Sequence, residues 1–362
     1  MNCPNFQVGK HIFKFGEVAL AAYKISKMGI KMSTAKFKAL LVKEENGKFI
    51  REITERSIND LPDGDVLIKV KYSSLNYKDA LSATGNKGVT RKYPHTPGID
   101  ASGIVAESMN KNFKEGDEVL ATGYDLGMNT SGGFAEYIRV PAGWVVKIPS
   151  KLSVKESMIL GTAGLTAALA LDKMEQVGFD KDGEVLVTGA SGGVGSMAVA
   201  IFAKQGYNII AGTGKTEQKK YLKEIGAASL ISREEMNDKT NKALLSGRWS
   251  GVVDTVGGNI LATAIASTKQ WGVVAACGNV ASVELHATVF PFILRGVSLL
   301  GINSEKTPIE LREKLWAKLA NEWKPVNLDI MYEECSLEET NKKIDEILHG
   351  KIKGRVLVRV GK

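Results

Sequence analysis

The chain has 362 residues, of which 44% are hydrophobic and 24% charged, and its 38 Gly exceed the ~7% share of an average protein. This composition is typical of a globular protein large enough for two domains, and it excludes a collagen-like chain. We find no uninterrupted run of ~18 apolar residues and therefore expect no membrane-spanning helix. Cys3, Cys277 and Cys335 are too few and too scattered for a disulfide framework or a four-cysteine zinc lobe, and they favour a reducing compartment such as the cytoplasm.

The net charge of +8 is unevenly distributed. Residues 1–31 contain five Lys and one Glu, so half of the excess charge lies in this leader and the remainder of the chain is close to balance. Such a charge is poor evidence for nucleic-acid binding. Because Met32-Ser33-Thr34 resembles a natural start, we interpret residues 1–35 as an N-terminal extension outside the fold. A basic amphipathic surface anchor is the alternative.

Residues 36–150 alternate short apolar segments with turn signals such as Pro62-Asp63-Gly64 and Glu115-Gly116-Asp117. Short strands at this spacing favour a small, irregular β-barrel over a parallel sheet. The predicted strands are 37–42, 66–71, 103–105, 118–120 and 144–148.

A different pattern begins at Ser153, which forms a capping box with Glu156 and opens a helix. From residue 184 onward, six apolar strands alternate with helical segments over 194–205, 216–225 and 258–267. This alternation is typical of a doubly wound parallel sheet. The predicted strands are 185–187, 208–211, 229–231, 252–255, 273–276 and 297–302.

The C-terminal part departs from this alternation. Thr307-Pro308 predicts the start of one helix, Ser336 that of another, and residues 355–360 form a last strand. We expect these elements to return to the first domain. The expected domains are then a catalytic domain over 36–152 and 305–362, and an inserted dinucleotide-binding domain over 153–304.

The strongest chemical signal is Gly189-Ala190-Ser191-Gly192-Gly193-Val194-Gly195, here called the glycine loop, which joins a strand to a helix. Glycines let a pyrophosphate approach the backbone, and a helix N-terminus offers free N–H groups and a favourable dipole. The order strand, turn, helix, strand therefore predicts a dinucleotide site. The alternative is a glycine turn that only packs the helix on the sheet.

The end of the second strand indicates which dinucleotide is bound. NAD sites usually carry Asp or Glu ~20 residues after the glycines, whereas the segment Ala211-Gly212-Thr213-Gly214-Lys215-Thr216 has neither. Thr213 offers a hydroxyl, and Lys215 and Arg233 offer cations for a 2′-phosphate. We therefore predict NADPH. The alternative is that Lys215 and Arg233 are ordinary solvated charges.

Several stretches together carry a family pattern: 73–81 (Ser-Ser-Leu-Asn-Tyr-Lys-Asp-Ala-Leu), 97–103, 132–137, 161–168, the glycine loop and 291–297. On these motifs the chain resembles the medium-chain dehydrogenase/reductase superfamily, in its zinc-free quinone-oxidoreductase branch and near the acrylyl-CoA reductase type. The resemblance covers about residues 36–361. It implies an α/β fold, with a GroES-like irregular β-barrel catalytic domain and an inserted Rossmann domain.

Zinc-dependent members of that superfamily hold a catalytic zinc with Cys, His and Cys. The matching positions here are Asn76, Ile99 and Thr162, whose side chains cannot make a zinc site of the usual N/S type. We interpret the nearby His95 as an ordinary loop histidine. Without a Lewis acid at these positions, hydride addition to an activated C=C bond or a quinone is favoured over alcohol oxidation.

The resemblance also implies residue roles. Tyr77 would lie beside the nicotinamide as donor to an enolate oxygen or proton donor; the alternative is a packing aromatic. Other implied cofactor contacts are Thr166 at the nicotinamide end, Ser191, Gly192, Gly193 and Val194 at the pyrophosphate, Thr213, Gly214, Lys215 and Arg233 at the 2′-phosphate, and Gly278, Asn279, Ile293 and Ser304 near the nicotinamide half.

Two further regions have alternative interpretations. Many relatives carry Asn where this chain has His349, which puts a cofactor contact there in doubt. Lys87, Arg91 and Lys92 form a basic loop that could meet the phosphates of coenzyme A, with a solvated loop as the alternative.

We therefore expect an NADPH-dependent, zinc-free reductase of an activated C=C bond, with an acrylyl-CoA-type enoyl thioester as the first substrate class and a quinone as the second. A non-catalytic NADPH-binding sensor or structural protein is the alternative of another class. We further expect a cytoplasmic homodimer that pairs through the apolar edge strand 297–302, with no nucleic-acid or membrane partner.

Overall fold

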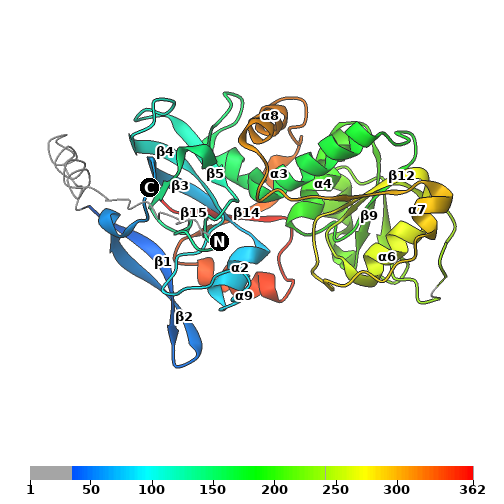
Figure 1. Ribbon diagram of the computed structural model, residues 1–362, viewed down its shortest axis with the longest axis horizontal. Helices are drawn as coiled ribbons and strands as arrows, with labels where there is room; N and C mark the ends of the chain where they lie inside the picture. Colours follow the sequence, from blue (N-terminus) through cyan, green and yellow to red (C-terminus); the bar gives the residue numbers. More distant parts are fainter. Residues whose placement is uncertain (1–34, 241, 362) are drawn as a thin grey trace, which may run out of the picture.

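The computed structural model describes residues 35–240 and 242–361. Figure 1 shows two lobes side by side, with the long helix α3 (Val154–Val177) and helix α8 (Ile309–Ala320) lying between them. The predicted N-terminal extension lies outside the described residues, apart from Ala35.

The first lobe is built on a seven-stranded sheet in the order β14-β15-β3-β4-β5-β7, with β6 paired to β3, and a separate hairpin of β1 and β2. All its ladders are antiparallel except β14 with β15. The predicted irregular barrel is confirmed. The strands are β1 (Lys36–Glu45), β2 (Lys48–Ser57), β3 (Val66–Leu75), β4 (Asp100–Ser108), β5 (Glu118–Thr122), β6 (Tyr137–Val140), β7 (Val145–Lys147), β14 (Tyr332–Ser336) and β15 (Arg355–Arg359), and α2 spans Tyr77–Ala83.

The C-terminal strand β15 lies beside β3, with Val356 opposite Leu75, so the end of the chain completes the sheet of the first lobe. Strand β14 and helix α9 (Thr340–Leu348) precede it. The helix begins four residues later than predicted, because Ser336 ends β14. Ser336 and Glu339 do exchange hydrogen bonds, the Ser336 N–H donating to the Glu339 carboxylate (2.8 Å), but they close a turn rather than the first turn of a helix.

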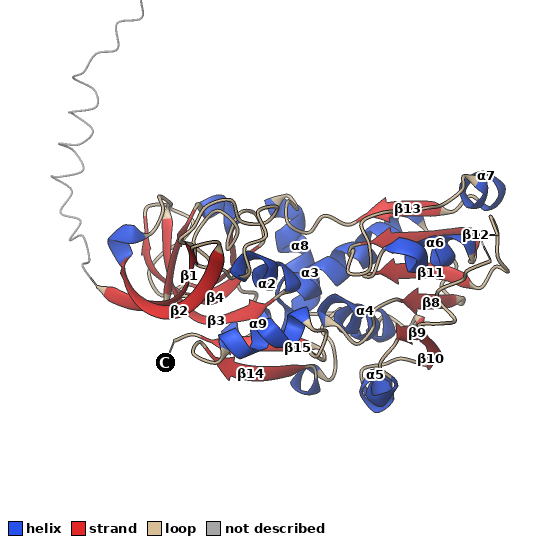
Figure 2. Ribbon diagram, turned by 90° about the horizontal axis from the view of Figure 1, so that it is seen from below, coloured by secondary structure: helices blue, strands red, loops and turns tan. Residues whose placement is uncertain are grey.

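The second lobe contains the predicted parallel sheet, in the order β10-β9-β8-β11-β12-β13. Helices α3 and α4 pack on one face of this sheet and share one buried apolar cluster, and α6 packs on the other face over a second cluster. Figure 2 shows the strands pointing toward the first lobe, so their carboxyl ends meet it. The elements are β8 (Glu184–Val187), α4 (Gly193–Lys204), β9 (Asn208–Thr213), α5 (Lys219–Glu224), β10 (Ser229–Ser232), β11 (Trp249–Asp254), α6 (Gly258–Ala266), β12 (Thr268–Ala276), α7 (Phe290–Arg295) and β13 (Ser298–Gly301).

Helix α3 bears on the expectation that no helix spans a membrane. Its mean hydropathy of 1.3 would allow it, by length and composition alone, to cross a membrane. Gly, Ser and Thr interrupt its apolar run without making it polar. Because 78% of the apolar window is buried inside the protein, α3 has the surroundings of a core helix.

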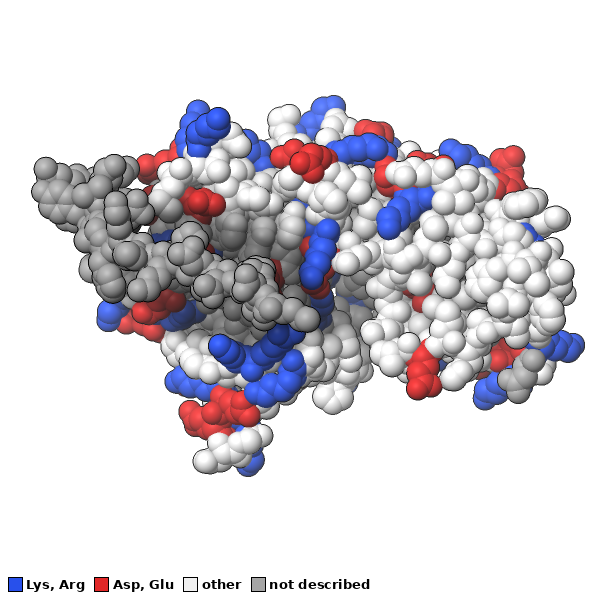
Figure 3. Space-filling view, in the orientation of Figure 1, with Lys and Arg blue, Asp and Glu red and all other residues white. Residues whose placement is uncertain are grey.

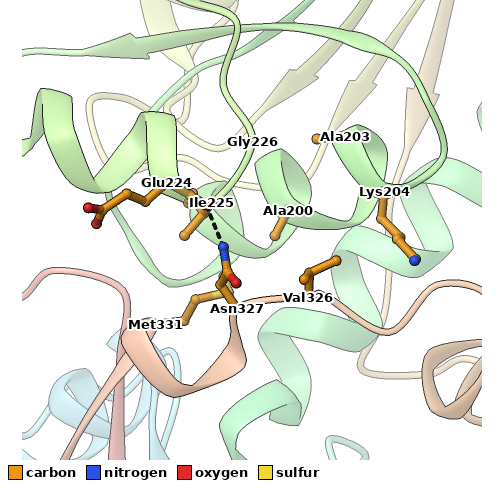
Figure 4. Close-up of a pocket in the computed structure, with 9 residues that line it drawn as sticks. All are labelled: Ala200, Ala203, Lys204, Glu224, Ile225, Gly226, Val326, Asn327 and Met331. Carbon is orange, nitrogen blue, oxygen red and sulfur yellow. Dashed lines mark hydrogen bonds between the residues drawn. The ribbon is translucent and has the colours of Figure 1, made fainter.

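A surface groove of about 340 Å³ lies between α4, the end of α5 and the segment before β14. Figure 4 shows Asn327 reaching across it, where the side-chain amide donates to the Glu224 carbonyl (2.7 Å). Ala200, Ala203 and Lys204 place the groove at the carboxyl end of α4. The glycine loop precedes the amino end of that helix, about 15 Å away along its axis, so the groove is separate from the dinucleotide site.

Candidate active site

The glycine loop connects the carboxyl end of β8 to the first turn of α4, with Gly192 as the N-cap. Gly189 has a φ of +59°, and a Cβ on Gly195 would lie 2.2 Å from the Gly189 carbonyl oxygen, so the turn closes only without a side chain there. The Ala190 N–H donates to the Gly212 carbonyl (3.0 Å), which ties the loop to β9. The helix N–H groups at this end of α4 fit the pyrophosphate of a dinucleotide.

The predicted 2′-phosphate residues lie together beside this loop. The Ser191 and Thr213 hydroxyls are 3.3 Å apart, and the Lys215 N–H donates to the Thr213 hydroxyl (3.1 Å). The Arg233 guanidinium packs on Gly214, where a Cβ would lie 2.9 Å from it. Burial lowers the pKa of Lys215, and the charge of Arg233 lowers it further, against the opposing effect of Glu217. Two neighbouring cations of this kind fit a phosphate dianion.

Tyr77 is the first residue of α2, and its side chain is 39% exposed. Asp79 holds this helix in place, because its buried carboxylate accepts hydrogen bonds from the N–H groups of Asn76 (2.8 Å), Gly98 (3.1 Å) and Ile99 (2.8 Å). Burial raises the pKa of Asp79 to about 7, although these N–H donors favour the carboxylate. The contacts fix the first turn of α2, and with it Tyr77.

Asn76 and Thr162, two of the three residues that the resemblance matches to zinc ligands, share a hydrogen-bond acceptor. The Asn76 amide (2.8 Å) and the Thr162 hydroxyl (2.5 Å) both donate to the buried carboxylate of Asp100. Ile99 is buried. Over residues 35–240 and 242–361, no group of three or more His, Cys, Asp or Glu side chains could hold a metal ion.

Thr166 and Ser304 meet one turn further along α3, with their hydroxyls 2.7 Å apart. Arg312 fixes this end by donating to the Ser304 carbonyl (2.9 Å). Next to these residues, Lys78 of α2 forms an ion pair with Glu305. The structure therefore brings the Tyr77 end of the site and the Thr166–Ser304 end into one region at the junction of the lobes.

Gly278 and Asn279 follow β12 at the carboxyl edge of the sheet, where a Cβ on Gly278 would lie 2.2 Å from the Thr255 carbonyl oxygen. Ile293 is not brought to this edge. It belongs to α7, which precedes β13 and so lies at the amino ends of the strands, at the far right of Figure 1, with its side chain 68% exposed. The motif containing Ile293 was placed near the nicotinamide from the resemblance, although its position directly before the predicted strand 297–302 already indicates the amino end of that strand.

The remaining basic residues considered as ligand contacts differ in whether protein groups already bind them. The Lys87 ammonium pairs with Glu44 (2.6 Å) and lies 4.8 Å above the Tyr93 ring, while Arg91 and Lys92 are exposed. His349 ends α9, with Nδ1 2.7 Å from the Asp345 carbonyl oxygen. His95 is buried, and burial lowers its pKa, as expected for a structural histidine.

Asp100 and Arg355 received no role from the sequence, yet both are buried at the site. Their ionic groups lie 3.8 Å apart. For Arg355 the available signal was its position as the first residue of the predicted strand 355–360, since a charge there needs a partner when it is buried.

Two family models match the chain: "Alcohol dehydrogenase GroES-like domain" over residues 62–150 and "Zinc-binding dehydrogenase" over 193–321. The acrylyl-CoA reductase AcuI of Ruegeria pomeroyi is 42% identical over 327 residues, which cover 90% of this chain and 99% of the relative. The chain belongs to the medium-chain dehydrogenase/reductase superfamily. YhfP of Bacillus subtilis, named provisionally as a quinone oxidoreductase, is 46% identical over 91% of this chain and 100% of its own length.

A solved superfamily structure also matches. The yhdH oxidoreductase from Salmonella enterica, in complex with NADP, has a TM-score of 0.87 and 41% identity over 90% of this chain and 100% of that one. One matching family model is named for zinc binding. That Asn76, Ile99 and Thr162 stand where zinc-dependent members carry their ligands stays a prediction from the resemblance.

We predict that the purified protein contains much less than one zinc ion per chain, because an amide, an alkyl group and a hydroxyl replace N/S ligands at these positions. Elemental analysis checks this directly. Treatment with a chelator should leave activity unchanged. About one tightly bound zinc per chain, with activity lost on chelation, would contradict the prediction.

Proposed function

We propose that this protein is an NADPH-dependent reductase that adds hydride to an activated C=C bond, with an acrylyl-CoA-type enoyl thioester as its substrate class. The observation that carries the proposal is that the glycine loop, with its basic neighbours Lys215 and Arg233, lies next to the junction of the lobes. At that junction, Asn76 and Thr162 stand at positions that the resemblance matches to zinc ligands. The relationship to AcuI, at 42% identity over nearly its whole length, supports the substrate class.

NADPH would supply the hydride. The glycine loop would hold its pyrophosphate, and Thr166 and Ser304 would lie at its nicotinamide end. The 2′-phosphate would be held by Thr213, Lys215 and Arg233. Hydride addition to the β-carbon of an enoyl thioester leaves negative charge on the thioester oxygen. The Tyr77 hydroxyl donates a hydrogen bond to this developing enolate, which lowers its energy, and then gives its proton to the α-carbon. The tyrosinate that remains is reprotonated from solvent.

A quinone is the second candidate substrate. YhfP is 46% identical and carries a quinone-oxidoreductase name. In addition, Lys87 of the basic loop is already paired with Glu44, which reduces the charge available for coenzyme A phosphates. A quinone needs the same hydride and no coenzyme A contact.

Initial rates of NADPH oxidation against a panel of enoyl-CoA esters and quinones test the proposal. We expect kcat/KM to be highest for a short enoyl-CoA. Faster turnover of quinones would make the second candidate the function. Stoichiometric NADPH binding without turnover of any acceptor would favour a sensor or structural role.

We further propose that the catalytic domain spans residues 36–152 and 305–362 and that the dinucleotide-binding domain spans residues 153–304.

We also propose that the protein is a cytoplasmic homodimer. Strand β13 is the edge of the six-stranded sheet. The right-hand lobe carries few charged side chains on the face seen in Figure 3. A single chain leaves a set of large apolar side chains exposed on and around α7 and β13, which fits an interface: Trp271, Val283, Val289, Phe290, Ile293, Leu294 and Leu299.

Light scattering should therefore give about twice the chain mass of 39.0 kDa for the wild type. Leu294→Glu places a charge on the exposed apolar face of α7 and should shift the protein to a monomer. Val326→Glu, at a similarly exposed apolar residue outside this face, is the matched control and should leave the mass unchanged. A monomeric wild type at micromolar concentration would refute the homodimer.

A further inference from the structure

The carboxylate of Asp100 is fully buried where the lobes meet, and residues of three elements bind it. Removing a carboxylate from water is costly unless several donors replace the water. Here the hydrogen-bond donors come from the end of β3 and from α3: the Ser74 hydroxyl (2.6 Å), the Asn76 amide (2.8 Å), and the Thr162 N–H (2.9 Å) and hydroxyl (2.5 Å). The Arg355 guanidinium of β15 forms an ion pair with the carboxylate at 3.8 Å and donates a hydrogen bond to the Ser74 hydroxyl (2.8 Å). We call these five residues the Asp100 cluster.

Arg355 extends the cluster to the glycine loop. Its Nε donates to the Ile159 carbonyl (3.1 Å), and a Cβ on Gly193 would lie 3.0 Å from its guanidinium, so the side chain packs directly under the loop. The preceding residue, Gly354, donates its N–H to the Ser191 carbonyl (2.9 Å). The Gly354 backbone thus contacts the glycine loop, and the side chain of the next residue, Arg355, contacts the Asp100 carboxylate.

The backbone of α3 is shaped to admit this cluster. Gly161 interrupts the helix with a φ of +51°, and a Cβ there would lie 2.6 Å from the Asp100 carboxylate and 3.0 Å from the Arg355 guanidinium. The interruption directs both the N–H and the hydroxyl of Thr162 to the same carboxylate. A helix without this glycine could not approach so closely.

We propose that Asp100 is a positioning residue for hydride transfer. Its contact with Asn76 fixes the residue next to Tyr77 and thereby orients Tyr77. Its contact with Thr162 orients the turn of α3 that ends at Thr166. Its ion pair with Arg355 holds these two segments against the glycine loop. This role rests on the proposed reductase function. Asp100 is covered by its donors and does not touch the reacting atoms. Replacing a buried ion pair by apolar residues is often neutral for stability, so stability alone does not account for these directional bonds.

Hydride transfer depends steeply on the alignment of donor and acceptor, and a shift of ~1 Å can cost ~10²-fold in rate. Thr162→Val keeps the side-chain shape but removes the hydroxyl that binds Asp100. We expect it to lower kcat about 10- to 100-fold, with NADPH affinity changed less than about threefold. Thr162→Ser retains the hydroxyl and should restore kcat. Asp100→Asn leaves the buried Arg355 without a charge partner, so its folding is checked first by thermal unfolding.

Ser102→Ala is the matched control. Ser102 is buried on the same strand, and its hydroxyl donates to the Val154 carbonyl (2.8 Å) outside the cluster. We expect its kcat to match the wild type. A second readout uses no acceptor: the fluorescence of bound NADPH reports the nicotinamide environment, and it should change in Thr162→Val but not in Ser102→Ala or Thr162→Ser.

The positioning role is overturned if Thr162→Val retains normal kcat and NADPH fluorescence, if Thr162→Ser fails to restore them, or if Ser102→Ala lowers kcat as much as Thr162→Val. If the wild type reduces no acceptor, the proposed reductase function fails. The NADPH fluorescence of the same variants then still decides whether the Asp100 cluster positions the nicotinamide end.

Discussion

Replacing Tyr77 by Phe is expected to lower kcat about 10²- to 10⁴-fold, because the hydroxyl that donates to the developing enolate is lost. NADPH affinity should change little, since the predicted phosphate contacts lie on the other lobe. The ring of Tyr77 is 39% exposed at the first turn of α2, so removing one oxygen leaves core packing intact, and the melting temperature should stay the same. Steady-state kinetics with isothermal titration of NADPH measure both quantities.

Tyr72→Phe is the matched control for this variant. Tyr72 lies on β3, which leads into the same site, but it packs against the core between the lobes. Its kcat should equal that of the wild type. A Tyr77→Phe enzyme with near-normal kcat would instead assign Tyr77 to cofactor packing and the proton to water.

The double substitution Lys215→Ala with Arg233→Ala is expected to remove the preference for NADPH over NADH. Charge-assisted hydrogen bonds to a phosphate contribute ~1.5–3 kcal/mol each, so each lost cation should weaken NADPH binding roughly tenfold to a hundredfold. NADH has no 2′-phosphate, so its affinity should hardly change. Added salt should weaken NADPH binding more than NADH binding in the wild type.

The pH dependence of NADPH binding follows from the same pocket. The pKa of Lys215 lies below its ordinary value of 10.5, mainly through burial, so Lys215 loses its proton at lower pH than an exposed lysine. A neutral Lys215 binds the phosphate less tightly. NADPH affinity should therefore fall as the pH rises through the alkaline range, while NADH affinity stays constant.

Calorimetric titration of NADPH and NADH into the wild type and into the Lys215→Ala, Arg233→Ala double variant tests the predicted preference for NADPH. Lys219→Ala, at an exposed lysine four residues beyond Lys215, is the control and should behave as the wild type. Equal affinities of the wild type for NADPH and NADH, or an unchanged preference in the double variant, would mean that the 2′-phosphate lies elsewhere.

Local sequence patterns were enough to predict the features that depend on neighbouring residues. The six parallel strands were found because they are short apolar segments and because turn and helix signals follow three of them, β8, β9 and β11. The glycine loop was found because strand, turn and helix N-terminus are adjacent in the chain. Strand β2 was missed because only three of its ten residues are apolar and they do not alternate regularly with polar ones, and β6 was missed because it has only four residues.

Which distant segments meet could not be predicted from such local patterns. Asp100 and Arg355 are 255 positions apart, and no local pattern indicates that β15 lies beside β3. Ile293 was placed at the cofactor from its motif, whereas the direction of β13 puts α7 at the opposite end of the sheet. Local propensity determines where a helix or strand forms. Burial and long-range pairing determine which side chains meet, and in this protein they bring Asn76, Asp100, Thr162 and Arg355 together at the junction of the lobes.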